Sequence, residues 1–486
     1  MCRRRLSLLV LASLALGPGA CRDHNAGAVK VVVVGGAPRL RDPATAPLSA
    51  PDAVLLGTTA QGLVRFDATG NIVGGLAESW AVTDDGLSYI FRLAAGTWPN
   101  GRKITAEQVA RTLKRSLANS SVNPLKDTLG AVDDIVAMTD KVIEIRLRAP
   151  RPNLLALLAQ PEFAVVRNGA GGGPFVIEAT RGQPGELRLT RELVSVDEET
   201  TTRQELQLSG ATAEKAVQLF AGGGADLVLG GTYADLPFAQ RIKLPRGSLR
   251  FDPASGLFGL VPTRAAGTLA DPGVRQLLSQ AIDRDALMDA MRVPGLAARA
   301  TVLEPGLEGL GPPVAPAWTA TPLVQRRPGL AAESQRQFGA EKPVVRIFLP
   351  TGPGADILFD RLKFDWGILG IDVQRAANVA ASDLKLVDSV APSSSPAWFL
   401  RQFRCGVAPI CNADADELLD AARDTLIPAQ RSALLAQAAA KIDEVQLFIP
   451  LTAPVRWSLV STRVQGFAGN RYARHTLTDL EQRSSP

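Results

Sequence analysis

The chain has 486 residues, of which 46% are hydrophobic and 21% are charged, and its formal net charge is +5. Because single hydrophobic cores stop growing at roughly 250–300 residues, a chain of this length is expected to form more than one folding unit. The composition excludes wholesale disorder and a protein with many membrane spans. Three of the positive charges lie in a predicted leader, which leaves +2 on the rest of the chain and argues against a nucleic-acid-binding surface.

The N-terminus has the layout of a secretory signal peptide. Arg3–Arg5 supply a basic segment, and Leu6–Leu16 form an apolar segment that is too short to span a membrane as a stable helix. Small residues then precede Cys21. We therefore predict a lipoprotein signal peptide over residues 1–20, acylation of Cys21 as the first mature residue, and a polar tether over residues 21–28.

Pro18 departs from this pattern, because lipoprotein cleavage sites usually carry a small or β-branched residue at that position. The alternative is ordinary signal cleavage, which would leave Cys21 as a free thiol. Export is expected in either case.

In chain order, the first elements are strands and a helix. Val29–Val34 is an apolar β-branched run that predicts a buried strand, and Gln61–Phe66 leads into a hairpin. Asp85-Gly86 supplies the turn of this hairpin, between segments in which apolar and polar residues alternate. Thr105 and Gln108 form a capping-box pattern that predicts the start of a helix.

Beyond this region, strand and helix signals alternate as in an α/β fold. The predicted strands lie at 205–208, 226–229, 344–349, 370–371, 448–451 and 457–460, and the predicted helices at 213–220, from 271, at 357–366 and at 429–445. The strand–helix–strand run that starts at Val344 predicts a βαβ unit. Stretches rich in Pro and Gly, at 304–317 and 391–396, are predicted to be loops.

Several of these segments together resemble the family 5 extracellular solute-binding proteins of the peptide- and nickel-binding type. The segments that carry the likeness are Gly75–Trp80, Asp84–Leu93, Asn100–Val109, Gly173–Phe175, Asp271–Leu287 with its Ala-Ile-Asp-Arg run, and Ile449–Leu451. Two features depart from the family pattern. Arg191–Thr202 contains no aromatic residue where the family carries an Asn-x-x-Tyr-Trp-like segment, and the later Trp–acid ligand-binding stretch is hard to place.

The resemblance implies an α/β, two-lobed periplasmic-binding-protein-like fold of the large type II variant, with a hinge and an interlobe cleft. Residues 29–263 with 455–486 would form lobe one, and residues 264–454 would form lobe two. The implied protein is an exported, periplasmic, membrane-anchored substrate-binding lipoprotein of an ABC importer. It would be a monomer that carries a peptide or another small polar solute to permease and ATPase subunits. An anchored sensory or interaction protein on the same scaffold is the alternative.

Enzymatic chemistry, cofactors and a metal are not expected. His24 and His475 are the only histidines, so a nucleophile–base pair or a metal ligand set is hard to assemble. Cys405 and Cys411 lie close together in an exported chain, so we predict a small disulfide loop, with two unpaired thiols as the alternative.

The candidate solute site combines two segments. The residues chosen are Thr232, Tyr233, Asp235, Asp388, Trp398 and Arg401. The first three follow a predicted strand, and ligands of α/β folds tend to bind beyond the carboxyl ends of strands. Arg401 would pair with a ligand carboxylate, Asp235 or Asp388 would meet an amino group, and Trp398 would form an apolar wall from a predicted loop. The alternative places Trp398 in the core and Arg401 in a surface ion pair.

Overall fold

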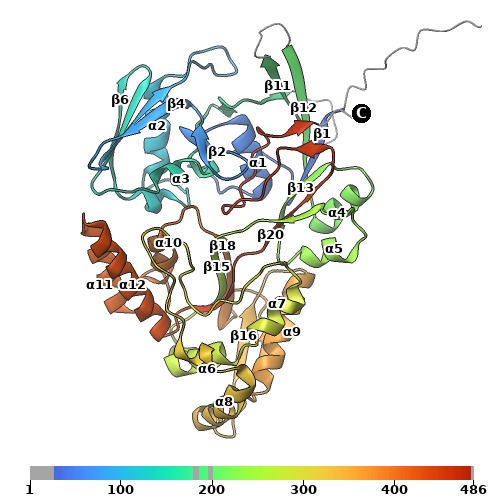
Figure 1. The fold of residues 1–486 in the computed structure, drawn as a ribbon, viewed down its shortest axis with the longest axis vertical. Helices are drawn as coiled ribbons and strands as arrows, with labels where there is room; N and C mark the ends of the chain where they lie inside the picture. The colour runs from blue at the N-terminus through green and yellow to red at the C-terminus, as the bar shows by residue number, and fades with distance from the viewer. Residues whose placement is uncertain (1–26, 179–184, 195–200, 483–486) are drawn as a thin grey trace, which may run out of the picture.

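The computed structural model describes residues 27–178, 185–194 and 201–482, and it shows an α/β molecule with two lobes (Figure 1). The predicted signal peptide, Cys21 and most of the predicted tether lie outside the described residues. Within those ranges, no helix combines the length and the apolar composition needed to cross a membrane.

A seven-stranded sheet lies on the right side of the upper lobe in Figure 1. Its order is β10 (Val176–Glu178), β11 (Glu186–Val194), β12 (Thr201–Ala211), β1 (Val29–Val34), β13 (Leu227–Thr232), β20 (Arg456–Val460) and β14 (Leu249–Phe251). The predicted strand over Val29–Val34 is confirmed, and it pairs in parallel with β12 and β13.

Helices cover both faces of β1, which explains its unbroken apolar sequence. Val31 and Val33 pack in one core with Leu55 of α1 (Ala50–Thr59). Val32 packs in another core with Val217 of α4 (Ala213–Ala221). The β-branched run is therefore buried on both sides of the sheet.

A four-stranded sheet extends the upper lobe, with its own core and helix α2 (Ala106–Leu117). Its order is β4 (Ala77–Val82), β5 (Ser88–Leu93), β7 (Val142–Leu147) and β6 (Val132–Thr139). Thr105 caps α2 as predicted, because its side chain accepts from the Gln108 backbone. The capping box is one-sided, since the Gln108 side chain accepts a hydrogen bond from Trp98 Nε1 at 2.7 Å.

The remaining elements of this lobe are short. They are β2 (Val64–Phe66), β3 (Ile72–Gly74), η1 (Lys126–Leu129), α3 (Leu154–Leu158), η2 (Pro161–Phe163), β8 (Val166–Arg167), β9 (Ala170–Gly171), α5 (Leu236–Arg241), β21 (Val464–Gln465) and β22 (Glu481–Gln482). Of these, α3 contacts both β2 and η1, so these three elements pack together.

The lower lobe contains a five-stranded sheet in the order β17 (Asp372–Arg375), β16 (Val344–Phe348), β18 (Leu384–Val390), β15 (Gly256–Pro262) and β19 (Ile449–Thr452). The predicted βαβ unit is present as β16, α9 (Pro353–Gly367) and β17, with parallel strands. The other elements are η3 (Thr268–Ala270), α6 (Pro272–Ala281), α7 (Arg284–Met291), η4 (Ala317–Ala320), α8 (Leu323–Phe338), α10 (Pro396–Leu400), η5 (Arg401–Phe403), α11 (Ala413–Asp424) and α12 (Pro428–Glu444).

The chain crosses between the two large sheets twice. The first crossing is residues 252–255, between β14 and β15, and the second is residues 453–455, between β19 and β20. The predicted boundary at 263/264 differs from the first crossing, because β15 pairs with β18 and β19 inside the five-stranded sheet. An apolar strand suits either sheet, so its sequence could not choose between them. The predicted boundary at 454/455 falls within the second crossing.

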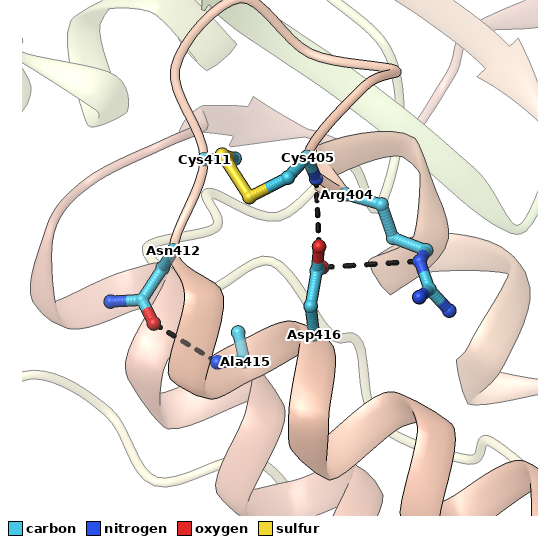
Figure 2. Close-up of a disulfide and its surroundings, with 6 residues drawn as sticks. All are labelled: Arg404, Cys405, Cys411, Asn412, Ala415 and Asp416. Atoms are coloured by element: carbon cyan, nitrogen blue, oxygen red, sulfur yellow. Dashed lines mark hydrogen bonds and ion pairs between the residues drawn. A yellow bond between two sulfur atoms is a disulfide. The ribbon is translucent and has the colours of Figure 1, made fainter.

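Cys405 and Cys411 form a disulfide, with their Cα atoms 5.1 Å apart (Figure 2). The bridged loop leads directly into α11, whose first turn is capped by the side chain of Asn412. Asp416 of this helix accepts a hydrogen bond from the Cys405 backbone nitrogen at 2.9 Å and lies near the guanidinium of Arg404 (Figure 2). The loop is therefore fixed at both ends.

Candidate functional site

The two lobes touch directly through polar side chains. Gln160 follows α3 in the upper lobe, and its Nε2 donates to the carbonyl oxygen of Pro392 in the lower lobe at 2.8 Å. Asn153 Nδ2 lies 3.3 Å from Ser393 Oγ across the same boundary. Figure 1 shows α10, which begins shortly after these lower-lobe residues, facing the edge that contains α3. The segments 153–160 and 392–401 thus form two sides of an interlobe surface.

A second polar contact joins the lobes close to the hinge. Arg456 of β20 places one terminal nitrogen 2.8 and 3.0 Å from the two carboxylate oxygens of Asp388 in β18. Burial raises the pKa of Asp388, and the Arg456 guanidinium opposes that rise. Asp388 was predicted to meet an amino group of the solute. The structure places it inside a strand with its carboxylate already bound.

Thr232, Tyr233 and Asp235 follow the carboxyl end of β13 as predicted. Thr232 Oγ1 donates to Asp235 Oδ2 at 2.9 Å, and burial raises the pKa of that carboxyl group. Tyr233 is 2% exposed and packs edge-on against Phe258 of β15, with ring centroids 4.8 Å apart. Its hydroxyl oxygen is buried and has no hydrogen-bond partner among the described residues. Tyr233 is therefore a core residue where the two lobes join.

The segment that contains Trp398 and Arg401 is helical, so the predicted loop is wrong there. A proline starts this turn: Pro396 stands at the first position of α10, where a proline is tolerated because the N–H of that position needs no partner. Trp398 is 8% exposed and packs edge-on against Phe399, as the core alternative anticipated. Arg401 is half-buried in η5 and has no ion pair with any described residue, so the surface ion-pair alternative does not apply.

Two of the six predicted residues lie in separate hydrophobic cores. Tyr233 belongs to a core that extends from the seven-stranded to the five-stranded sheet, and Trp398 belongs to a separate core around α10, α11 and α12. Burial lowers the pKa of Arg401, and the carboxylate of Asp127 in η1 opposes this effect. Since η1 belongs to the upper lobe, Arg401 faces the opposite side of the interlobe surface.

Sequence reasoning missed several residues of this surface. Arg151 of the upper lobe and Arg431 of the lower lobe both donate to the carbonyl oxygen of Pro150, at 2.9 and 3.3 Å. Glu308 lies close enough to be attracted to both guanidiniums. These residues come from separate elements, and no motif in the sequence links them with one another or with Gln160.

A groove follows the hinge itself. It is lined by residues 251–254, 293–297, 299 and 453–456, which include most of both crossings, and its volume is about 400 Å³. Its charged residues are paired, as in the contact of Asp252 with His475 at 3.1 Å. No cluster of three or more His, Cys, Asp or Glu side chains suited to a metal ion occurs in the described ranges.

The fold and the interlobe surface define a two-lobed binding protein of the type II periplasmic class. Residues 71–374 match the family described as bacterial extracellular solute-binding proteins, family 5 Middle. Because this match covers more than half of the sequence, the chain belongs to family 5 of the extracellular solute-binding proteins, as its motifs predicted.

Individual relatives agree with this assignment. A probable di/tripeptide-binding protein of Pseudomonas aeruginosa is 24% identical over 85% of this chain and 88% of the relative. The structure of Haemophilus influenzae OppA in complex with the peptide RPPGFSPFR matches 94% of this chain and 99% of its own, with a TM-score of 0.79 and 17% identity. AgaA from A. tumefacien R10, in complex with agropinic acid, matches 95% and 99% with a TM-score of 0.73 and 18% identity. The family and these relatives are binding proteins.

Proposed function

We propose that this chain is the substrate-binding lipoprotein of an ABC importer, which captures a peptide or another small polar solute between its lobes and delivers it to a membrane permease. The observation that carries the proposal is the polar interlobe surface, where Gln160 and Asn153 of one lobe reach Pro392 and Ser393 of the other. A solute that contacts both sides would favour the closed arrangement by its differential affinity for the two states.

The hinge supports such a motion. The large sheets are linked by short crossings at 252–255 and 453–455, and such segments can absorb the rotation of one lobe relative to the other. Next to the hinge, Tyr233 packs on Phe258, and Arg456 binds Asp388. The motion would therefore pivot about a packed contact, and closure would bring together the two sides of the edge that contains α3 and α10.

The proposed solute contacts lie at that edge. Arg401 would line the lower side, with Asp127 opposite it, and the buried Trp398 would support this turn from the core. Thr232 ends strand β13 of the upper lobe, and Asp235 follows it. Both would border the proposed solute site nearer the hinge. Asp388 and Tyr233 would support the hinge instead of touching the solute, because one is bound by Arg456 and the other is buried.

The relatives support the range of proposed solutes. The Pseudomonas aeruginosa protein is described as binding di- and tripeptides, whereas AgaA was solved with agropinic acid. The scaffold therefore does not by itself choose between peptides and other small polar molecules. We propose no catalytic step and no cofactor for this chain.

The location and partners follow from the leader. Export, acylation of Cys21 and attachment through a short tether would keep a monomeric protein in the periplasmic space beside permease and ATPase subunits. Intact-mass measurement of the protein extracted from membranes tests the anchor. An unmodified N-terminus on a freely released protein would contradict it.

Thermal-shift screening of the purified mature protein tests solute binding, because a ligand specific to the folded state raises the melting temperature by mass action. Peptides, amino acids, sugars and organic acids form the panel. We expect at least one class to stabilise the protein, and a panel without effect would contradict the proposal. If a solute binds but a strain without the permease still accumulates it at the parental rate, the sensory alternative is favoured.

A further inference from the structure

The interlobe surface contains a guanidinium that the described residues leave unsatisfied. Arg401 is half-buried in η5, and its five N–H donors have no hydrogen bond or ion pair within the described ranges. Asp127 attracts it across the lobe boundary without bonding to it. Because an uncompensated charge is costly to remove from water, an anion is expected to meet Arg401 when the lobes enclose a solute.

Acidic side chains around this surface are, in contrast, already engaged. Asp388 is bound by Arg456, and Glu162 is paired with Arg474 at 2.6 Å. Further acids with bonded partners are Asp235, Asp252 and Glu304. A peptide ammonium group that approached these carboxylates would have to displace an existing partner, so they offer it little net attraction.

Two acids at the interface have no bonded partner among the described residues, and both lie near arginines. Asp127 faces Arg401, and Glu308 is attracted to Arg151 and Arg431. The hydrogen bonds of Arg151 and Arg431 go to backbone carbonyls, which leave their charges uncancelled. The interlobe surface thus contains three guanidinium groups that lack a bonded carboxylate and only two carboxylates that lack a bonded cation. It therefore carries an excess of positive charge.

We infer that the solute is recognised through a carboxylate and not through an ammonium group, and that Arg401 binds this carboxylate. The inference rests on the proposed solute-binding function and names its substrate class: small organic acids, and peptides with a free C-terminal carboxylate, whether or not their amino group is blocked. The planar guanidinium suits a carboxylate in a two-point contact. Trp398 lies three residues earlier, so it adjoins Arg401 on the same face of the turn.

Blocked peptides separate the two modes of recognition. A random tripeptide library is prepared in three forms: free, N-acetylated, and C-amidated with a free amine. A mixture of small mono- and dicarboxylic acids is the fourth probe. Melting temperatures of the mature protein are measured with each, and affinities of the active probes are measured by titration calorimetry. We expect stabilisation by the free and acetylated libraries or by the acids, and none by the amidated library.

Two substitutions test the assigned residue in opposite directions. Arg401→Gln is expected to weaken binding of the active carboxylate probe roughly ten- to hundredfold, because one charge-assisted contact is lost. Asp127→Asn is expected to strengthen it, since the competing carboxylate is removed. Arg336→Gln is the matched control, because it removes the same charge from an exposed position of α8 in the same lobe.

Stabilisation by the amidated library that equals that of the free library would overturn the inference while leaving solute binding intact. Unchanged affinity in a folded Arg401→Gln protein would overturn the assignment of Arg401. A protein that responds to none of the four probes but is stabilised by another class of the screening panel would overturn this inference alone, whereas a protein stabilised by no class would refute the proposed function as well. Opposite effects of Arg401→Gln and Asp127→Asn would support the proposal, since a purely structural defect lowers affinity in both.

Discussion

Substitution of Arg456 should destabilise the protein, because it breaks the ion pair with Asp388 that joins the two sheets beside the hinge. The Arg456 and Asp388 side chains are 17% and 16% exposed. Arg456→Met keeps an apolar stem of similar length but removes both contacts to the Asp388 carboxylate, at 2.8 and 3.0 Å. Breaking a buried pair by removing one partner costs about 3–5 kcal/mol, and the partial exposure lowers the expected loss to about 2–4 kcal/mol.

This loss should depend on pH. Burial raises the pKa of Asp388, and the loss of Arg456 removes the group that opposes this rise. A carboxyl group with a raised folded-state pKa stabilises the fold at low pH, and that stabilisation is lost as the pH rises through the folded-state value. Arg456→Met should therefore cost more at pH 8 than at pH 5.

Thermal unfolding followed by circular dichroism at the two pH values is the assay. For a cooperative chain of this size, 1 kcal/mol corresponds to roughly 1 °C, so the melting temperature should fall by about 2–4 °C at pH 8. The double variant Arg456→Met with Asp388→Leu is the control and should recover most of the loss, because no charge is left unpaired. Equal losses at both pH values, or a double variant no more stable than the single one, would refute the reasoning.

Three further predictions concern other parts of the molecule. Replacing Cys405 and Cys411 by Ser should lower stability by about 2 kcal/mol, because the bridged loop is short; labelling of unreduced, denatured parent protein should find no free thiol at either position. Burial raises the pKa of Asp443 from 3.8 to about 7, so Asp443→Asn should stabilise the protein by about 1–3 kcal/mol at pH 8 and by less at pH 5 in urea unfolding. A Cβ added at Gly354 would lie 1.9 Å from the Tyr233 carbonyl oxygen across the lobe boundary, so Gly354→Ala should enlarge the radius of gyration in small-angle scattering; an unchanged profile would contradict this.

The local signals that proved reliable depend on backbone chemistry. The β-branched run at Val29–Val34, the turn glycine Gly86 with φ +68°, and the Asp271 cap that precedes Pro272 all form what their residue types favour. Family motifs added the two-lobed class, which no single element shows. Together, these features allowed most of the fold to be predicted from the sequence.

The candidate site was harder to predict from the sequence, because it depends on tertiary contacts. The pairing of Asp388 with Arg456 could not be predicted, since the two residues come from strands of different sheets and meet only where the two lobes join. Pro396 was taken as a loop signal, although it begins a short helix that buries Trp398 and Phe399. Gln160 has no sequence motif, and its importance comes from a contact with a carbonyl oxygen of the opposite lobe.

Hydrogen–deuterium exchange with and without the most strongly stabilising solute tests the central claim most directly. If the solute binds between the lobes, saturation should slow exchange in residues 153–163 of the upper lobe and in residues 391–401 of the lower lobe together. Distant segments, such as α8 at Leu323–Phe338, should serve as the internal control and remain unchanged. Protection confined to one lobe, or absent from both segments at saturation, would contradict the account.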